Sequence, residues 1–414
     1  MLEARRDVGA GTSKANTALL HTGFDAKPGT LEARLVPRGH ALLSEYAPQV
    51  GIPLARVGAL LVAWSAQQLA ALSGIVEQAE QNGHTNIRRV EVDELYELEP
   101  QLGPGAHGAL EIPDEGILCP FTTTLALATE AMLAGCDLRL ETRVTGVRRA
   151  GGGFVVETNR DAFGARFLVN AAGLYSDEVD RMLGHDRFTV TPRRGELIVF
   201  DKLARPLVNH IVLGVPTGTT KGVLVAPTVF GNLIIGPTAE DVYRKDDTSS
   251  TAAGLARVRG EGERIVPALL RHEVTAVYVG LRAATEHQDY QVTIDDGYAC
   301  AGGIRSTGVG ASLAIAEHVL ELLGSAGLEL RPKAERPTVR MPNLGELAPR
   351  AYQDRGPIVC FCERVTLGEI EDALASTIPP VDLDGLRRRT RVLMGRCQGF
   401  YCGARVRALL QEAR

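Results

Sequence analysis

Four of the seven cysteines lie in the last 55 residues of the 414-residue chain, and their spacing suits a metal site. They form a C-x-C pair and a C-x4-C pair separated by 34 residues: Cys360, Cys362, Cys397 and Cys402. Four thiolates from two loops can enclose a [2Fe–2S] cluster. Zinc is the alternative, but zinc knuckles favour C-x2-4-C pairs, and the C-x-C pair of this chain is unusual for them. We therefore predict an iron–sulfur cluster with these four ligands, in a reduced compartment rather than in a secreted disulfide framework.

Small-residue loops lead into helices at two places, and a long loop opens the chain. Residues 9–30 (GAGTSKANTALLHTGFDAKPGT) predict the long loop, and residues 169–173 end a strand in a tight turn before a helix. Residues 302–310 (GGIRSTGVG) open a long amphipathic helix. N–H groups at the amino end of a helix attract negative charge, so this last loop suits an anionic group.

Hydrophobic periodicity indicates the elements that position these segments. Helices are predicted at 31–47, 66–81, 121–134 and near 251–270, and a strand followed by a helical turn at 90–100. Strands are predicted within 138–150, 151–161 and 165–173, in an antiparallel sheet over 187–240, and again up to Cys300. Residues 331–356 have no clear period and predict a linker. The last segment, 357–414, predicts a separate small unit with helices near 367–374 and 404–411.

The overall composition is that of an ordinary globular protein. Hydrophobic residues make up 45% of the chain and charged residues 23%, so disorder is excluded as the main state. The net charge is −5 with scattered basic residues, which argues against nucleic acid as a principal partner. The strongest apolar run, residues 57–64, is too short to span a membrane, although peripheral membrane association stays open. The first residues lack a signal-peptide core, so we expect a cytoplasmic protein.

Four segments in order resemble one enzyme family. Residues 2–5 are similar to the end of a strand that places Glu3 at a ribose-binding position, and GAGTSKANTALLHTGF follows. Residues 143–147, 169–177 and 302–310 complete the set. Together they resemble the FAD-dependent oxidoreductases that include D-amino-acid oxidase, glycerol-3-phosphate dehydrogenase and L-2-hydroxyglutarate oxidase. The resemblance implies FAD as cofactor, with contacts at Glu3, Thr12, Ser13, Asn16, Val144, Ala172, Gly173, Gly303, Arg305, Thr307, Gly308 and Gly310.

The glycine fingerprint of such a fold is missing near the start. A dinucleotide-binding chain normally opens with a strand, G-x-G-x-x-G and a helix, and no such motif precedes Glu3. We interpret this as a truncated or misannotated start that lacks about 30 residues, the size of one such unit. The rival interpretation is a non-catalytic electron-transfer or assembly subunit without full FAD binding.

Clues to the substrate point in two directions. HTGFDAKPGTLEARL resembles L-2-hydroxyglutarate oxidase, because Phe24 and Asp25 stand where glycerol-3-phosphate enzymes commonly carry an arginine. The C-terminal cysteine unit resembles bacterioferritin-associated-ferredoxin-like (BFD-like) [2Fe–2S] domains. Its fusion to an oxidoreductase resembles the A subunit of anaerobic glycerol-3-phosphate dehydrogenase. An amino-acid or opine dehydrogenase is a further enzyme alternative.

Alcohol oxidation through a flavin needs a base for the hydroxyl proton and a clamp for the substrate anion. The resemblance implies His21 as a candidate base, and His210 is a second candidate because it lies in the sheet region expected to cover the substrate. The resemblance also implies Arg282 as the clamp, and a planar guanidinium suits a carboxylate or phosphate. Arg194 and Arg305 are second choices for the clamp.

Taken together, we expect an α/β protein in which an N-terminally truncated Rossmann-like FAD-binding domain is interleaved with an antiparallel substrate sheet. The expected FAD-binding parts are residues 1–50, 115–186 and 296–325, and the substrate domain takes 51–114 and 187–295, all within residues 1–330. The linker 331–356 and a small α-helical [2Fe–2S] domain at 357–414 follow. The expected activity is a dehydrogenase for a small anionic hydroxy substrate, whose electrons leave through the cluster to an acceptor protein or partner subunit.

Overall fold

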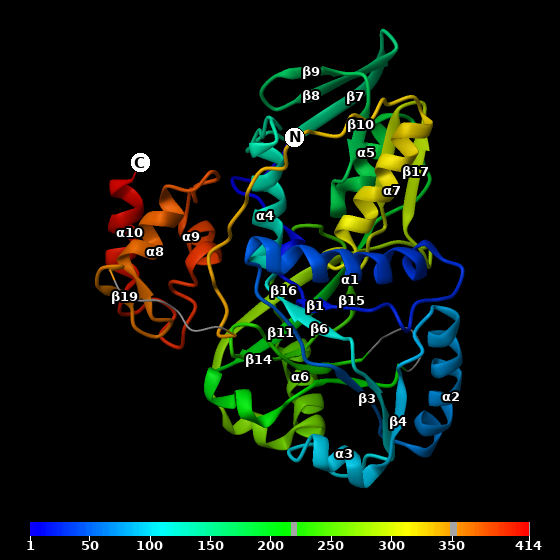
Figure 1. Ribbon diagram of the computed structural model, residues 1–414, viewed down its shortest axis with the longest axis vertical. Helices are drawn as coiled ribbons and strands as arrows, with labels where there is room; N and C mark the ends of the chain where they lie inside the picture. Colours follow the sequence, from blue (N-terminus) through cyan, green and yellow to red (C-terminus); the bar gives the residue numbers. More distant parts are fainter. Residues whose placement is uncertain (217–221, 348–353, 414) are drawn as a thin grey trace.

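The computed structural model describes residues 1–216, 222–347 and 354–413. Its main body divides into a large sheet with flanking helices and an upper part built on smaller sheets (Figure 1). A smaller helical unit lies to one side and contains the C-terminus. Among the described residues, no helix combines the length and the hydropathy that a bilayer span requires.

The large sheet is assembled from two distant parts of the chain. Its strands follow the order β15-β11-β14-β13-β12-β3-β5-β4, and β16 pairs with β11. The bounds are β3 Ala59–Ala63, β4 Arg88–Val90, β5 Gly108–Ile112, β11 Thr191–Phe200, β12 Ile211–Gly214, β13 Leu224–Pro227, β14 Leu233–Gly236, β15 Glu240–Asp241 and β16 Val274–Ala284. The predicted antiparallel sheet over 187–240 is confirmed, except that β12 also pairs in parallel with β3.

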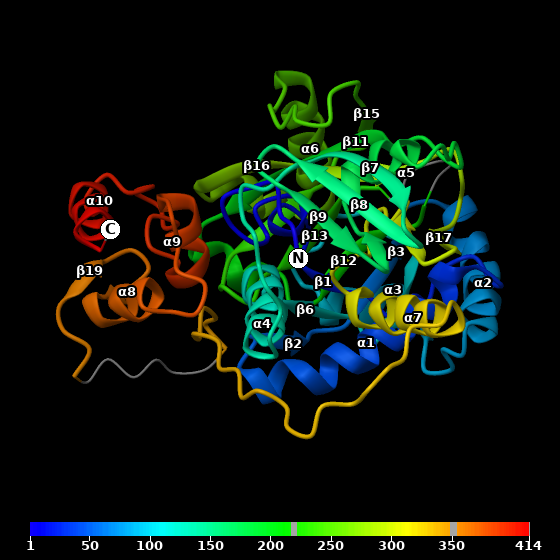
Figure 2. The same ribbon diagram turned by 90° about the horizontal axis from the view of Figure 1, so that it is seen from above.

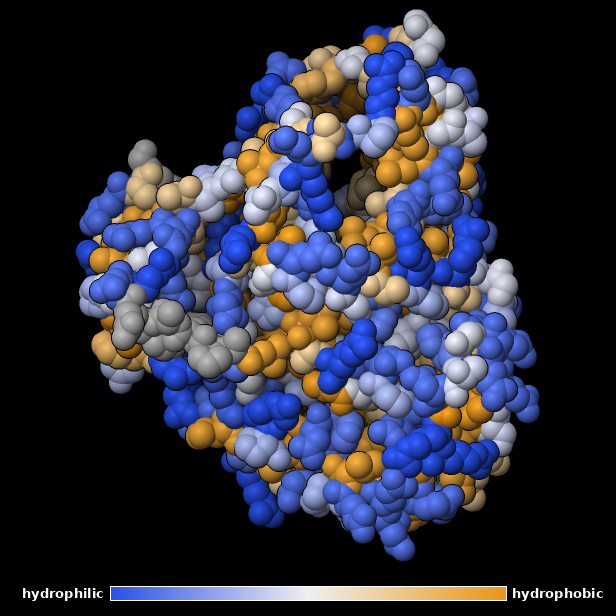
Figure 3. Space-filling view, in the orientation of Figure 1, coloured by the Kyte–Doolittle hydropathy of each residue, from blue (hydrophilic) through white to orange (hydrophobic). Residues whose placement is uncertain are grey.

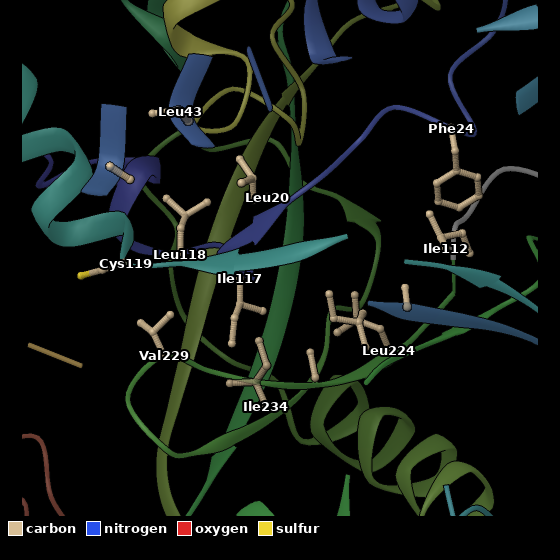
Figure 4. Packing of buried hydrophobic residues seen from close by; sticks show 14 of the residues in the cluster. Leu20, Phe24, Leu43, Ile112, Ile117, Leu118, Cys119, Leu224, Val229 and Ile234 are labelled. Carbon is tan, nitrogen blue, oxygen red and sulfur yellow. The ribbon is translucent and has the colours of Figure 1, made fainter. Parts of the chain in front are cut away.

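Both faces of this sheet are buried, which explains the nearly continuous apolar runs of its central strands. Along β3, Leu61 packs into one hydrophobic cluster, whereas Leu60 and Val62 pack into another on the opposite face. This alternation follows the two-residue period of a strand. Figure 4 shows the first cluster, where Ile117 and Leu118 meet side chains from several segments of the chain.

Three smaller sheets complete the main body. A parallel pairing joins β10 (Leu168–Asn170) to β18 (Tyr298–Gly302), and β17 (Gln291–Asp295) flanks β18. The meander β7 (Val144–Ala150), β8 (Gly153–Thr158) and β9 (Ala162–Ala165) lies at the upper end in Figure 1. The third sheet contains β1 (Leu19–Leu20), β6 (Gly116–Leu118) and β2 (Leu54–Arg56). Strand β9 was not predicted as a separate element.

The helices of the main body confirm, within a few residues, those predicted from the hydrophobic periodicity. They are α1 Leu31–Val50, α2 Ala66–Gln81, α3 Val92–Leu98, α4 Pro120–Leu133, α5 Ser176–Met182, α6 Ala252–Ile265 and α7 Ser312–Ser325, with 3-10 turns at Thr12–Lys14, Gly173–Tyr175, Lys202–Leu207 and Pro267–Arg271. Helix α1 begins where the Thr30 side chain accepts from the Ala33 N–H, and it ends at the left-handed Gly51. Its close packing against α7 requires Gly39, since a Cβ there would lie 2.5 Å from the Gly310 carbonyl oxygen.

The C-terminal unit has its own hydrophobic core. A short pairing of β19 (Ile358–Cys360) with β20 (Val365–Thr366) precedes three helices, α8 Leu367–Leu374, α9 Leu383–Thr390 and α10 Gly403–Glu412. The predicted helices at 367–374 and 404–411 are confirmed. Helix α9 was missed because its sequence, LDGLRRRT, offers few apolar positions, and its arginines are buried through contacts outside the helix.

The segment that joins the two parts has no helix or strand among its described residues, 331–347 and 354–356. It nevertheless packs along the main body. The Met341 N–H donates to the Val50 carbonyl at 2.7 Å, and Val339 and Leu344 are buried. From the side and from above, the C-terminal unit lies next to α4 and the first residues of the chain (Figures 1 and 2).

Candidate functional site

The four cysteines of the C-terminal unit lie in two contacting pairs. The thiol of Cys362 contacts that of Cys397, and the thiol of Cys360 contacts that of Cys402. Within the described part of the chain, no three histidine, cysteine or acidic side chains converge closely enough to hold a single ion. Two pairs of sulfur ligands fit a two-iron cluster, in which each iron takes two thiolates, better than they fit one tetrahedral zinc.

The local backbone favours a charged sulfur at this site. The N–H groups of Tyr401 and Gly399 point at the Cys397 sulfur and lower the pKa of its thiol. Gly399 has a φ of 86°, and the Gln398 backbone is also left-handed, so the chain turns tightly around the sulfur. The thiolate is the form that binds metal, so these N–H groups suit Cys397 as a cluster ligand.

The predicted FAD loop (residues 9–24) lies against strand β16. The Thr12 hydroxyl donates to the Leu281 carbonyl at 2.9 Å, and the Tyr278 hydroxyl donates to the Asn16 carbonyl at 2.7 Å. Gly280 permits this contact, because a Cβ there would lie 1.9 Å from the nearest carbonyl oxygen of the loop. The predicted FAD contacts Thr12 and Asn16 therefore lie next to the strand that carries Arg282.

The other predicted flavin segments expose backbone and small side chains. Ala172 and Gly173 are exposed at the end of β10, where Gly173 has a φ of 58° and a Cβ added to it would meet no atom within 4 Å. No side chain caps the amino end of α7, which the loop 302–310 precedes. Figure 3 shows the surface hollowed near the place where Figure 1 draws β10 and α7. These features fit FAD, whose phosphates and ring need close backbone approach and N–H donors.

The N-terminal residues take the position expected of a parallel strand. Leu2 forms a parallel bridge with Arg139, and the Thr142 N–H donates to the Glu3 carbonyl. A polar cleft of about 500 Å³ lies close by, between this segment, the start of β7 and the C-terminal unit. Arg5 and Arg143 line one side of the cleft, near the predicted adenosine contacts Glu3 and Val144.

His21 is held between two carboxylates. Its Nδ1 lies 2.7 Å from Glu115 Oε1, and its Nε2 lies 2.9 Å from Asp25 Oδ1. Burial alone would lower the pKa of His21, but the negative charges of Glu115 and Asp25 outweigh it and raise the pKa to about 10. The group is therefore an imidazolium at neutral pH, and the three side chains together carry a net charge of −1.

Glu115 forms the buried end of this triad. Its side chain is 0% exposed, whereas those of His21 and Asp25 are 16% and 17% exposed. Its Oε1 also accepts from the Thr22 N–H and hydroxyl, both at 2.8 Å. Burial disfavours the charged carboxyl, but His21 and Thr22 together lower the pKa of Glu115. Sequence reasoning missed this residue, whose one visible signal is an acid in a turn between two apolar strands.

Arg282 is a half-buried cation without a carboxylate partner among the described residues. Its Nη2 donates to the Thr238 carbonyl at 2.9 Å. Burial and the nearby Arg193 lower the pKa of Arg282 to about 10, so it stays charged at neutral pH. Gly195 on the adjacent strand makes room for the guanidinium, since a Cβ there would lie 2.8 Å from Nη2.

The remaining predicted residues have structural partners. Arg305 pairs with Glu32 of α1, and Thr307 contacts Tyr290 and Glu32, so both side chains fix the loop 302–310 to its surroundings. Arg194 pairs with Asp247 at 2.7 Å.

His210 lies at the start of β12 and is held by Glu99, whose Oε1 is 2.9 Å from Nδ1. Its ring also lies against Gly58, at the turn before β3. Both of these neighbours belong to the large sheet and its connections rather than to the flavin loops. His21 is thus part of the predicted FAD loop, whereas the neighbours of His210 are Glu99 and Gly58.

Buried ion pairs fasten the C-terminal unit to the main body. Asp7, at the start of the FAD loop, accepts from Arg388 and Arg389 of α9, and all three side chains are 6% exposed or less. Arg389 binds both oxygens of Asp7 at 2.7 Å. Lys14 adds a bond of 2.7 Å to Asp384.

A second set of contacts lies beside the cysteines. Glu363 follows Cys362 directly and binds Arg391 at 2.8 Å and Lys202 of the main body at 3.1 Å. The Arg391 guanidinium lies 4.1 Å from the ring centre of Phe230, also in the main body. The cluster loops are thus held directly against the oxidoreductase part.

Comparison with known proteins supports both parts of this interpretation. Residues 1–322 match the FAD dependent oxidoreductase family, and residues 358–412 match the BFD-like [2Fe-2S] binding domain. The chain belongs to the FAD dependent oxidoreductase family. It is an FAD-dependent enzyme, and its C-terminal unit is a [2Fe–2S] domain.

Relatives of this oxidoreductase carry related names. It is 33% identical to a glycerol 3-phosphate dehydrogenase from Caloramator mitchellensis over 99% of this chain and 88% of the relative. It is 28% identical to an L-2-hydroxyglutarate dehydrogenase from Escherichia coli K12 over 56% of this chain and 57% of that protein. Both of these relatives are named as dehydrogenases.

A solved structure shares the fold. The FAD-bound L-alpha-glycerophosphate oxidase from Mycoplasma pneumoniae superimposes with a TM-score of 0.78 at 26% identity, covering 82% of this chain and 91% of that one. Glycine oxidase from Geobacillus kaustophilus gives a TM-score of 0.70 at 22% identity. The expected α/β fold, FAD-binding architecture and small cluster domain are confirmed.

The His21 triad predicts a pH-dependent loss of stability in the Glu115→Gln variant. Removing one partner of a buried ion pair typically costs about 3–5 kcal/mol. The raised pKa of His21 means that its stabilisation is complete below about pH 6.5 and is lost as the pH rises through about 10. Urea unfolding should therefore show that Glu115→Gln lowers the free energy of unfolding strongly at pH 6 and less above pH 10.

Glu94→Gln is the matched control, since Glu94 forms an exposed pair with Arg88 and its loss should change the stability little. An equal loss of stability for Glu115→Gln at both pH values would contradict the charged triad.

Proposed function

We propose that the enzyme oxidises the hydroxyl-bearing carbon of a small anionic substrate, and that Arg282 binds the anion. The observation that carries this proposal is a half-buried guanidinium without a carboxylate partner in the described residues, on the strand against which the FAD loop packs. FAD, when bound, accepts a hydride from the substrate carbon. Arg282 orients that carbon by a charge-assisted fork to a phosphate or carboxylate.

We further propose sn-glycerol 3-phosphate as the substrate, ahead of L-2-hydroxyglutarate. The relative named for glycerol 3-phosphate matches nearly the whole chain, including the cluster domain, whereas the L-2-hydroxyglutarate dehydrogenase from Escherichia coli matches about half. Phe24 and Asp25 stand where other enzymes carry an arginine, and both have structural roles. Phe24 is buried in the core, and Asp25 binds His21. Arg282 is left as the anion-binding group.

The hydroxyl proton needs an acceptor, and the His21 triad supplies a net negative charge for it. An imidazolium has both ring nitrogens protonated, so His21 cannot itself accept the proton at neutral pH. Asp25 shares the Nε2 proton of His21 and is partly exposed, so a proton gained at its carboxylate neutralises the triad. His21 and Glu115 then position Asp25 and hold the compensating charge.

Electrons are proposed to leave through the [2Fe–2S] domain. A reduced flavin holds the two electrons of one hydride and can release them one at a time, which suits a one-electron cluster. The buried contacts of Asp7 and Glu363 fix the cluster domain in one position on the oxidoreductase, which supports transfer within one molecule. An acceptor then takes electrons from the cluster.

Arg282→Ala should raise the KM for sn-glycerol 3-phosphate at least tenfold in the FAD-loaded enzyme. A charge-assisted contact is worth about 1.5–3 kcal/mol, and each 1.4 kcal/mol is a factor of about ten. Arg282→Lys should recover part of the loss, because an ammonium cannot reproduce the planar fork. Steady-state kinetics with glycerol 3-phosphate and L-2-hydroxyglutarate side by side test both the clamp and the substrate.

The control is Arg244→Ala, which removes an exposed arginine paired with Asp246 and should leave KM unchanged. An unchanged KM in Arg282→Ala would assign that residue a structural role only. Faster turnover with L-2-hydroxyglutarate than with glycerol 3-phosphate would overturn the substrate proposal.

Cys397→Ser should abolish the cluster while substrate still reduces the flavin. The metal joins two loops that are distant in sequence, so its loss should also loosen residues 357–414. Iron content and turnover with an artificial acceptor that takes electrons from the cluster should fall. Anaerobic bleaching of the flavin by substrate should be unchanged. The matched variant Cys300→Ser alters a buried cysteine of β18 and should keep the iron. Anaerobic purification that yields one zinc per chain would refute the cluster assignment.

A further inference from the structure

Three large aromatic side chains next to the cysteines face solvent. Phe361 lies between Cys360 and Cys362 and is 75% exposed. Phe400 and Tyr401, between Cys397 and Cys402, are 84% and 79% exposed, and their rings contact edge to face at 5.2 Å. None of the three belongs to the hydrophobic core of the domain. We call these three residues the aromatic patch.

The cluster ligands reach the surface on one side only. Cys360 and Cys402 are 1% and 4% exposed, whereas the contacting pair Cys362 and Cys397 is only partly covered. One edge of the cluster site is therefore accessible from solvent, beside the aromatic patch.

The two segments that carry the cysteines expose basic residues, most of which are paired with acids from other segments. The exposed charged residues of segments 358–366 and 393–408 are all basic, namely Arg364, Arg396, Arg405 and Arg407. The single carboxylate in these segments, Glu363, is buried against Arg391 and Lys202. Three of these four arginines are paired with acids, Arg396 with Asp201, Arg364 with Glu346 and Arg405 loosely with Glu412. The surface is thus an aromatic centre with a weakly basic rim.

The main body holds α9 and a residue next to each of two ligands, Glu363 beside Cys362 and Arg396 beside Cys397, while the three aromatic side chains stay exposed. Asp7, Asp201 and Lys202 of the main body bind α9 and the cysteine segments. Aromatic residues are enriched at protein interfaces, and redox encounters bury little area, so a patch of this size suits a transient partner. A basic rim favours an acidic partner and accelerates its association.

We propose that the aromatic patch is the docking surface for a one-electron carrier protein with an acidic contact face. The inference rests on the proposed electron path. In each encounter the reduced cluster loses one electron and the carrier gains one, with no bond or proton transferred, so one substrate oxidation serves two encounters. The partner approaches the exposed edge formed by Cys362 and Cys397.

The test uses the full chain, reduced by dithionite and then desalted, so that it does not depend on substrate. Stopped-flow mixing with the acidic blue-copper protein plastocyanin, with basic cytochrome c and with ferricyanide follows cluster reoxidation. For the unaltered protein, the rate with plastocyanin should exceed that with cytochrome c and should fall as salt is added.

The Phe361→Ser/Phe400→Ser variant should lower the second-order rate with plastocyanin at least tenfold, while the electron paramagnetic resonance spectrum of the cluster is retained. Arg407→Glu should lower the same rate and weaken its salt dependence. Tyr243→Ser removes a fully exposed tyrosine elsewhere and is the matched control. Equal plastocyanin rates in the unaltered and patch-altered proteins would overturn the proposal.

Sedimentation analysis tests whether a second copy of this chain, rather than a carrier protein, binds the aromatic patch. A dimer that dissociates in the patch variant would overturn the carrier in favour of self-association. Failure of glycerol 3-phosphate to reduce the cluster would instead count against the proposed function, because dithionite reduction bypasses that step.

Discussion

The buried carboxylate of Asp7, shared by Arg388 and Arg389, is the interaction on which the arrangement of this enzyme depends. All three groups are removed from water, so each charge is tolerable only while the others are in place. Asp7 belongs to the segment that leads into the FAD loop, and the two arginines belong to the helix that precedes the cluster loop. The contact therefore places the two redox domains in one orientation.

A second constraint acts from the opposite side of the junction. Glu363, one residue from a cluster ligand, is bound by Arg391 and by Lys202 of the main body, and Arg391 stacks on Phe230. The C-terminal unit is therefore anchored at Lys202 and Phe230 of the main body as well as at Asp7. Such a two-point attachment keeps the distance between the redox centres constant, which a flexible tether would not do.

Sequence patterns predicted those parts of the fold whose signal is local. The apolar periodicity predicted a helix at residues 66–81, which are the bounds of α2, and the cysteine spacing indicated the cluster domain. Helix α9 was missed because its arginines are buried through Asp7, 381 residues away, which no window of sequence reveals. His21 was a candidate base from its position, but its charge is set by Glu115, 94 residues away, so its protonation state required the tertiary structure. His210 was a candidate because of its place in the predicted antiparallel sheet, and in the structure it binds Glu99.

The central claim is that electrons pass from a small anionic substrate to the docked cluster within one molecule. Anaerobic addition of sn-glycerol 3-phosphate to the FAD-loaded protein, with the cluster followed by electron paramagnetic resonance, tests it directly. We expect the reduced-cluster signal to grow as the flavin bleaches, and to grow more slowly in Asp7→Asn, where the buried contact is weakened. A flavin that bleaches while a dithionite-reducible cluster stays oxidised would contradict it.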